Sequence, residues 1–410
     1  MKIFKQVLLA PLVTALLTLG CTNDENLPPS NEVNPVEIPA AIADGSSRFA
    51  FNFLHNLQKN QPAEDNFFVS PLSLHMALGM LLNGAENESA AEIQKALEMQ
   101  GVSLEDLNKA YNTLIRDLPV ADSRVSLGLA NSIWYKNGLN VETSFQNVLK
   151  ESFQAEIAGL PFDDSSKDRI NKWASDKTNG KIKNVIETIE RDHLMFLLNA
   201  LYFKADWKAR FDPKETIDMP FKLENGSSKT VKMMRIKSAF KVAGGTTFGA
   251  VRLPYGNGQF TMTLLLPTAG NTIDAVLSEL DAEKWKTIIS GNAENNVKVG
   301  LPRFTLDYSR KLNETLYQMG IKKAFSNGAQ FGKISRSTPM KVDFVKQDAY
   351  LAIDEKGTEA AAVTAIGMVP TSTIPQEPTF ICDRPFGLII SENTSNTILF
   401  MGRIKNPDSK

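Results

Sequence analysis

The residues that most often build catalytic centres are scarce in this chain. It holds three histidines (His55, His75 and His193) and two cysteines (Cys21 and Cys382) among 410 residues. The GxSxG, HExxH, GxGxxG and P-loop fingerprints do not occur. Three histidines also leave little room for a Ser-His-Asp triad or a structural zinc site. We therefore predict that the chain is not an enzyme and holds neither a metal nor a cofactor.

Weaker possibilities for chemistry stay open. Acidic residues are plentiful enough to supply a catalytic carboxylate pair, although nothing singles one out. Ser70 could act as a nucleophile, but no partner base can be assigned to it. With Cys21 in the N-terminal segment, Cys382 has no partner for an internal disulfide, and we interpret it as a small buried hydrophobe.

The most informative segment covers residues 355–372 and reads EKGTEAAAVTAIGMVPTS. It follows an apolar stretch at 350–353 and begins with Gly357, which tolerates unusual backbone angles and suits a hinge. Small side chains follow, and no proline occurs before Pro370, so most of the segment could join a central strand. Composition alone leaves a helix over 358–365 equally open.

Strand alternation divides this segment into two faces. Glu359 carries the only charge after Gly357, and it falls on one face with Ala361, Val363, Ala365 and Gly367. The opposite face is uncharged and carries Thr358, Ala360, Ala362, Thr364, Ile366 and Met368. Small side chains and one uncharged face suit a loop that must later enter a sheet. By itself the segment leaves a helix and a sheet-entering loop, called the bait loop below, as equal alternatives.

The N-terminus has the pattern of an export signal. Lys2 and Lys5 precede an apolar run over 7–19, which is short for a transmembrane helix. The sequence LTLGC ending at Cys21 resembles a bacterial lipobox, although Thr18 departs from the usual aliphatic residue. We predict a signal peptide over 1–20, lipid on Cys21, and an extracytoplasmic, outer-membrane and possibly surface-exposed protein; plain secretion is the alternative.

The rest of the chain has ordinary globular composition. It is 42% hydrophobic with a formal net charge of −1, which argues against nucleic acid as a partner. Residues 21–44 are polar and proline-rich and are predicted to be a flexible tether. Helical patterns at 46–58, 70–73, 88–97 and 104–118 precede strand patterns at 195–203, 261–266, 296–301, 349–353 and 397–403. One monomeric α+β domain over 45–408 is predicted.

Ordered motifs around the bait loop resemble those of the serpin family over roughly residues 45–407. Each is short, and the number of them in order is what makes the resemblance specific. They include NFFVSPLS at 66–73, NGKI at 179–182, NALYFKADW at 199–207, FDP at 211–213, LPRF at 301–304, EKGTEAAA at 355–362, DRPF at 383–386 and FMGR at 400–403.

The resemblance implies a fold of three β-sheets surrounded by about eight or nine helices, with an exposed reactive-centre loop. It implies a suicide inhibitor: a serine protease attacks the loop, an acyl-enzyme forms, and the loop inserts into the main sheet with the protease attached. A non-inhibitory serpin-fold binding protein is the alternative. The implied hinge comprises Glu355, Gly357, Thr358, Glu359, Ala360, Ala361 and Ala362.

The resemblance also implies where the protease cuts. The residue before the bond is usually the seventeenth counted from the hinge glutamate, which gives Thr371–Ser372. Thr371 follows Met368, Val369 and Pro370 and suits an elastase-like or subtilisin-like pocket. No Lys or Arg lies between Gly357 and Asp383, so trypsin-like enzymes have no anchor. Bonds at Met368, Val369 or Ile374 are alternatives.

Five residues are implied in opening the main sheet, namely Ser70, Ser73, Asn199, Trp207 and Gln347. Gln347 stands where the family commonly has a histidine that contacts the positions of Ser73 and Asn199. Glutamine donates and accepts hydrogen bonds but does not titrate near neutrality. The network is therefore predicted to persist without a pH response.

Overall fold

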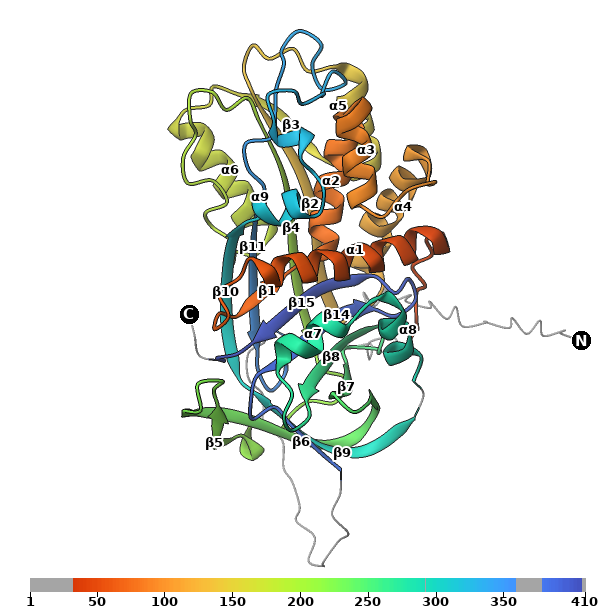
Figure 1. Cartoon of the computed structure of the whole chain (residues 1–410), viewed down its shortest axis with the longest axis vertical. Coiled ribbons are helices and arrows are strands. Elements are labelled where there is room, and N and C mark those ends of the chain that lie inside the picture. Colours follow the sequence, from red (N-terminus) through yellow and green to blue (C-terminus); the bar gives the residue numbers. More distant parts are fainter. Residues whose placement is uncertain (1–31, 292, 359–377, 408–410) are drawn as a thin grey trace, which may run out of the picture. The chain divides into compact units, whose positions relative to one another are not determined.

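Two β-sheets and the helices packed on them account for the part of the chain that the computed structural model describes, residues 32–291, 293–358 and 378–407 (Figure 1). The first sheet has six strands. In spatial order they are β10 (Phe304–Lys311), β11 (Lys346–Ile353), β12 (Gly357–Thr358), β4 (Met195–Asp206), β2 (Val125–Lys136) and β3 (Glu156–Leu160).

The second sheet has nine strands, and three of them are rich in apolar residues. Its order is β1 (Phe67–Val69), β15 (Ile398–Ile404), β14 (Phe386–Glu392), β8 (Phe260–Pro267), β7 (Phe248–Pro254), β6 (Ser228–Gly244), β9 (Glu294–Pro302) and β13 (Thr379–Ile381), with β5 (Ile217–Lys222) paired to β6. Every residue of β8, β14 and β15 is buried. Continuous apolar runs are expected for strands covered on both faces.

The mixed α+β fold matches the prediction, and one long strand explains how the expected three sheets are arranged. β6 pairs with β5 and β9 over most of its length and with β7 at its end, over 241–244. Two sections that the resemblance treats as separate sheets are therefore joined by hydrogen bonds through β6. The six-stranded sheet is the third.

The helices carry the amphipathic patterns that the sequence predicts. Nine α-helices occur in the described residues: α1 (Ala40–Lys59), α2 (Pro71–Gly84), α3 (Asn87–Ala96), α4 (Leu104–Asp117), α5 (Thr143–Phe153), α6 (Asp164–Lys177), α7 (Ile273–Glu279), α8 (Ala282–Ser290) and α9 (Asn313–Gln318). Figure 1 shows α7 and α8 beside the nine-stranded sheet and α2 to α6 around the six-stranded one. Within the described ranges, none of these helices combines the length and apolarity needed to span a bilayer.

The N-terminal tether is shorter than predicted. Helix α1 begins at Ala40, inside the range assigned to the tether, and Val36 is buried with only 1% of its surface exposed. The Val36 N–H donates to Thr394 Oγ1 at 2.9 Å, and the Asn34 N–H donates to Gln259 Oε1 at 3.2 Å. The buried side chains of Val36 and Ile42 attach this stretch to the domain. The prediction of a tether relied on the polar residues around them and did not take this burial into account.

Helix α2 supports the six-stranded sheet from behind and is buried along most of its length. Ser70 is its N-cap, and its hydroxyl accepts the Ser73 N–H at 3.1 Å. His75 lies next, with Nδ1 2.8 Å from the Tyr111 hydroxyl and Nε2 3.2 Å from the Leu97 carbonyl oxygen. Burial lowers the pKa of His75 to about 4, so the ring is neutral at pH 7.

Candidate functional site

The start of the predicted bait loop forms a short strand in the middle of the six-stranded sheet. β12 is antiparallel to both neighbours: Gly357 lies opposite Asp206 and Thr358 opposite Ala205 on β4, while Thr358 also lies opposite Ile353 on β11. Within the described residues, β4 and β11 are not paired directly and are connected only by their shared neighbour β12. The space between β4 and β11 is called the slot below.

Packing explains why these two residue types stand in β12. A Cβ atom built on Gly357 would lie 1.9 Å from the Ala205 carbonyl oxygen, so only glycine fits this close approach of backbone to backbone. Thr358 is 3% exposed, and its Oγ1 lies 2.7 Å from the Tyr255 hydroxyl. Burial raises the pKa of Tyr255, which therefore stays protonated as a hydrogen-bonding partner.

Trp207 anchors the residues just before β12. Its backbone N–H donates to the Lys356 carbonyl at 2.7 Å, and its indole Nε1–H donates to the Asp354 carbonyl at 2.9 Å. The indole stacks on Tyr255 with ring centroids 4.4 Å apart and an interplanar angle of 10°. Trp207 therefore connects residues 354–356, which form the entrance of the slot, to Tyr255, the hydrogen-bond partner of Thr358.

Glu355 is held at the same entrance although it carries a charge. Only 7% of the residue is exposed. Its Oε1 accepts the Thr216 hydroxyl at 2.8 Å and lies 3.5 Å from the guanidinium of Arg303, while its carbonyl accepts the Phe211 N–H at 2.9 Å. A buried carboxylate is tolerated here because it is both paired and hydrogen-bonded.

Of the predicted sheet-opening residues, Ser70, Asn199 and Gln347 lie further along the slot. Their hydrogen bonds differ in part from those that the resemblance implies. The Gln347 side chain accepts the Ser70 N–H at 3.0 Å and donates to the Ser70 carbonyl at 2.8 Å. Asn199 instead donates from Nδ2 to Asn131 Oδ1 at 2.7 Å. Gln347 thus joins β11 to the start of α2, and its side-chain hydrogen bonds within the described residues go to Ser70 and not to Ser73 or Asn199.

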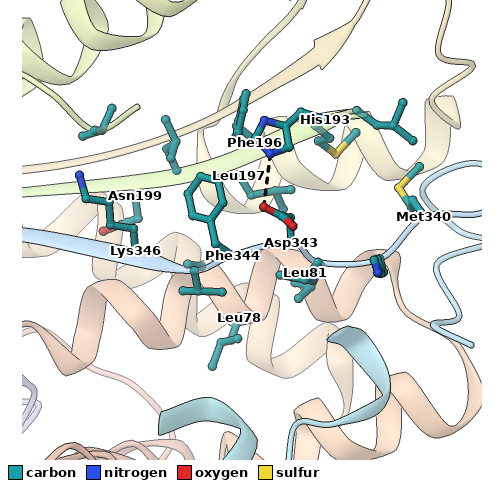
Figure 2. Close-up of a pocket in the computed structure, with 18 of the residues that line it drawn as sticks. Leu78, Leu81, His193, Phe196, Leu197, Asn199, Met340, Asp343, Phe344 and Lys346 are labelled. Carbon is teal, nitrogen blue, oxygen red and sulfur yellow. Dashed lines mark hydrogen bonds and ion pairs between the residues drawn. The ribbon is translucent and has the colours of Figure 1, made fainter. Parts of the chain in front are cut away.

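A cavity of about 470 Å³ continues the slot beyond these residues. Figure 2 shows Leu78 and Leu81 of α2 on one side and Leu197 of β4 on the other, with Phe344 between them. His193 lies at one end, 3.3 Å from an oxygen of Asp343. The cavity wall is largely apolar, and Ser73, Asn199 and Gln347 are among its polar members.

Several predicted site residues lie outside the described part of the chain. These are the hinge residues Glu359, Ala360, Ala361 and Ala362, the specificity residues Met368, Val369 and Pro370, the bond Thr371–Ser372, the alternative at Ile374, and Cys21. The described site therefore consists of Glu355, Gly357 and Thr358 together with the sheet-opening residues. Cys382 is fully buried, and burial raises the pKa of its thiol.

Sequence reasoning did not assign a role to four residues of this site. Thr216 and Arg303 hold Glu355, Tyr255 holds Thr358, and Asn131 holds Asn199. Tyr255 and Arg303 belong to short motifs at 253–255 and 301–304 that could have drawn attention to them. Their partners are more than 50 residues away in the chain, so the pairing itself requires the fold.

A six-stranded sheet with a two-residue central strand, a nine-stranded sheet and, in the described residues, nine helices agree with the serpin architecture that the sequence resemblance implies. Comparison with known proteins identifies the family. A model of the serpin family, described as serine protease inhibitor, matches residues 44–407. The chain belongs to the serpin family.

Similar proteins include a named elastase inhibitor and a thyroxine-binding protein. A leukocyte elastase inhibitor of Xenopus laevis is 32% identical over 380 residues, covering 89% of this chain and 99% of the relative. Human serpin B9 is 30% identical over 376 residues, with the same coverage. The native thermophilic serpin tengpin superposes with a TM-score of 0.83 at 28% identity, covering 91% of this chain and 96% of that one.

Human thyroxine-binding globulin, crystallised with its ligand, has a TM-score of 0.82 at 26% identity; the match covers 90% of this chain and 99% of that one. The same fold therefore serves at least one member that is a binding protein. This keeps the family assignment separate from the question of whether the chain inhibits a protease.

The prediction that the chain is simply not an enzyme needs correction. The family match is to serine protease inhibitors. Such suicide inhibitors enter the catalytic reaction of a protease as its substrate, although they are not catalytic enzymes themselves. In such inhibitors the relevant chemistry is that of the target protease, which a search for catalytic residues within the inhibitor does not address.

Proposed function

We propose that this chain is a suicide-substrate inhibitor of elastase-like or subtilisin-like serine proteases. The position of β12 is the observation that carries the proposal. Thr358 already lies between β4 and β11, buried and paired to both. The residues that follow it in the chain can continue along the same two strand edges once cleavage frees their far end.

The free energy for insertion would come from pairing and burial. Each added residue joins a central ladder, and a backbone hydrogen bond contributes roughly 1 kcal/mol net. The cavity offers apolar side chains of α2 and β4 against which a further strand could pack. About 14 residues at roughly 3.3 Å each would carry a tethered protease about 45 Å.

The proposed cleavage site is Thr371–Ser372, with Met368, Val369 and Pro370 read by the protease subsites. A small β-branched Thr371 suits a shallow apolar pocket. The curated relatives that are named leukocyte elastase inhibitors support an elastase-like target. Residues 358–382 contain neither lysine nor arginine, which a trypsin-like S1 pocket would require.

The direct test mixes the protein with pancreatic elastase. A complex that survives SDS, together with a released peptide beginning at Ser372, is the expected result. Clean cleavage without a complex would contradict inhibition. If the melting temperature of the protein were also unchanged by cleavage, a binding role of the kind that thyroxine-binding globulin exemplifies would be the better proposal.

We also propose that the domain is a lipoprotein attached through Cys21, with residues 1–20 removed. The lipobox-like LTLGC sequence and the polar stretch after it support this. Metabolic labelling with an alkyne fatty acid should mark the wild-type protein and leave Cys21→Ala unlabelled. Labelling of the variant would exclude Cys21 as the lipid attachment point.

A further inference from the structure

A second hollow lies on the nine-stranded sheet, away from the slot. It is a groove of about 610 Å³ whose walls include residues of β6, β7 and α8. In the described part of the chain it shares no lining residue with the cavity of the slot. Val33, among the first residues that the structure describes, also lines it. The groove is therefore a separate candidate site, next to the point where the N-terminal segment joins the domain.

Positive charge dominates the lining of this groove. Four cations and one carboxylate line it, namely Lys208, Lys241, Arg252, Lys286 and Glu294. Lys286 is balanced locally, because its Nζ lies 3.1 Å from Asp44 Oδ1 and 3.3 Å from Glu283 Oε1. The other three cations still outnumber Glu294. A hollow lined mainly by one sign of charge raises the local concentration of the opposite ion.

The register of the strands places two of these cations directly opposite each other. Lys241 on β6 pairs with Arg252 on β7, and Glu294 on β9 lies on the other side of Lys241. Like charges directly opposite each other destabilise a sheet, and one carboxylate balances only one of the two. Arg252 therefore supplies the excess charge in this row.

Arg252 is buried, and its guanidinium is not fully paired. Only 7% of the residue is exposed; Nη1 donates to the Ile289 carbonyl of α8 at 2.7 Å, and Nη2 donates to Asn393 Oδ1 at 2.6 Å. Its Nε is buried without a hydrogen-bond partner among the described residues. Burial lowers the pKa of Arg252, although a guanidinium stays charged at neutral pH. A buried cation with only neutral acceptors is stabilised when an anion binds beside it.

The groove also lies where a lipid anchor would keep it close to a bilayer. Asn257 lines the groove, and its Nδ2 donates to the Glu32 carbonyl at 2.8 Å. Val33 is 12 residues after Cys21. Even a fully extended chain of that length spans no more than roughly 40 Å. A lipid on Cys21 would therefore hold the groove within reach of lipid headgroups.

We propose that this groove binds a phosphate group, with Arg252, Lys241 and Lys208 as its cationic contacts, and that an anionic membrane phospholipid supplies the phosphate. Phosphate suits the site because it is charged and accepts several hydrogen bonds from guanidinium and ammonium groups. Such binding would orient the domain with the groove toward the bilayer. The lipid source rests on the proposed attachment through Cys21, whereas the phosphate site rests on the groove alone.

Vesicle binding tests the lipid source. The chain from residue 22 onward contains every described residue and cannot carry the proposed lipid. It is sedimented with vesicles of phosphatidylcholine alone or mixed equally with phosphatidylglycerol. We expect binding to the mixed vesicles only, weakened roughly 10- to 30-fold by Lys208→Glu, because each cation near a charged bilayer contributes about a factor of five. Lys150→Glu, at an exposed position of α5, changes the net charge equally and is the matched control, with less than about a 2-fold effect.

Thermal unfolding tests the phosphate site itself. The melting temperature in sodium phosphate is compared with that in sodium chloride of equal ionic strength, because a ligand of the folded state raises it. Phosphate also stabilises proteins generally, so the readout is the difference between variants. Lys208→Glu combined with Lys241→Glu should lose the specific part of the rise, and Lys150→Glu should keep it. Arg252→Lys keeps the charge but loses the planar fork, so its rise should be smaller than that of the wild type.

The outcomes separate the parts of this proposal. Equal responses of the groove variants and Lys150→Glu in both experiments would overturn the site. A phosphate effect that depends on the groove, without vesicle binding, would overturn the membrane lipid as the source and identify a soluble phosphate compound as the ligand. An unchanged rise in Arg252→Lys would remove Arg252 as a contact. Because neither experiment contains a protease, failure of this site and failure of elastase inhibition are observed independently.

Discussion

The two sheets differ in how completely their strands are paired. In the nine-stranded sheet β14 pairs with β8 over 387–392 and with β15 over 386–391, and all three strands are buried. In the six-stranded sheet, β11 pairs fully with β10 but meets β12 at a single residue pair. In the described residues β8, β14 and β15 are therefore paired along nearly their whole lengths, whereas β4 and β11 are bridged by β12 at one end only.

This difference suggests that the two sheets have different tasks. The fully buried sheet provides a core whose register is fixed by packing on both faces. In the six-stranded sheet, β12 lies between β4 and β11 at one end. Further along, Gln347 of β11 is hydrogen-bonded to Ser70 at the start of α2. Changes at these two places should alter inhibition strongly, while equivalent changes elsewhere in the same sheet should not.

The largest effect is expected from Thr358→Arg. Thr358 is buried against Tyr255, so a guanidinium there would have to be buried in the native slot and again after insertion. We expect the variant to be cleaved by elastase as a substrate, with no SDS-stable complex. Thr305→Arg, at an exposed position of β10 in the same sheet, is the matched control and should inhibit normally. Complex formation by Thr358→Arg would contradict the assigned facing.

Gly357→Ala should have the next largest effect. The added Cβ would meet the Ala205 carbonyl oxygen at 1.9 Å, and overpacking of this kind typically costs about 1–3 kcal/mol. We expect β12 to leave the slot and the urea midpoint of the native protein to fall. Gly245→Ala, where a Cβ meets nothing within 4 Å, should leave the midpoint unchanged. An equal fall in both variants would show that the slot is not the reason.

Sequence patterns predicted the elements on either side of the slot but not the contacts within it. The strand patterns at 195–203 and 349–353 lie within β4 and β11, because their apolar residues and alternation are local features. The bonds of Gln347 to Ser70 and of Glu355 to Arg303 join residues 277 and 52 positions apart. Which pair forms depends on the register of whole strands, which no local pattern specifies.

The docking of residues 32–44 on the domain was missed for a related reason. Their composition is that of a linker, yet Val36 and Ile42 are buried by residues distant in the chain, such as Thr394 near Val36. Burial by a remote surface overrides local polarity. The hinge residues Gly357 and Thr358 were easier to interpret, because their small size is itself the feature that the slot requires.

The pH dependence of the free energy of unfolding should come from His75 on α2 and not from the residues of the slot. Gln347 does not titrate, whereas burial lowers the pKa of His75 from 6.5 to about 4. The unfolded chain therefore binds a proton at His75 before the folded one does, so stability is full above pH 6.5 and is lost as the pH falls toward 4. The loss should approach about 3 kcal/mol at pH 4.

Urea unfolding measured between pH 7 and pH 4 checks this expectation. His75→Leu should flatten the part of the curve that His75 contributes, while the rate of complex formation near pH 7 should change little because the His75 ring contacts Tyr111 and Leu97 and not β12. An unchanged slope in the variant would remove His75 as the cause. A steep change in inhibition rate between pH 7 and pH 6 would instead point to a titrating group at the slot.

The smallest effect is expected from Glu355→Gln, which probes the junction between the two sheets. Arg303 lies between β9 of the nine-stranded sheet and β10 of the six-stranded one, so its contact with Glu355 ties the slot entrance to the better-paired sheet. Glutamine can still accept the Thr216 hydroxyl but loses the ion pair. Because Arg303 is half exposed, the loss should be at most about 1 kcal/mol.

Salt separates the charge contribution from the packing contribution at this junction. The difference between wild type and Glu355→Gln should shrink in 1 M NaCl, where the screening length is about 3 Å. Arg303→Gln should lose a similar amount, and the double variant should lose no more than either single one. If the losses were additive and insensitive to salt, Glu355 would stabilise the entrance through Thr216 and Phe211 alone.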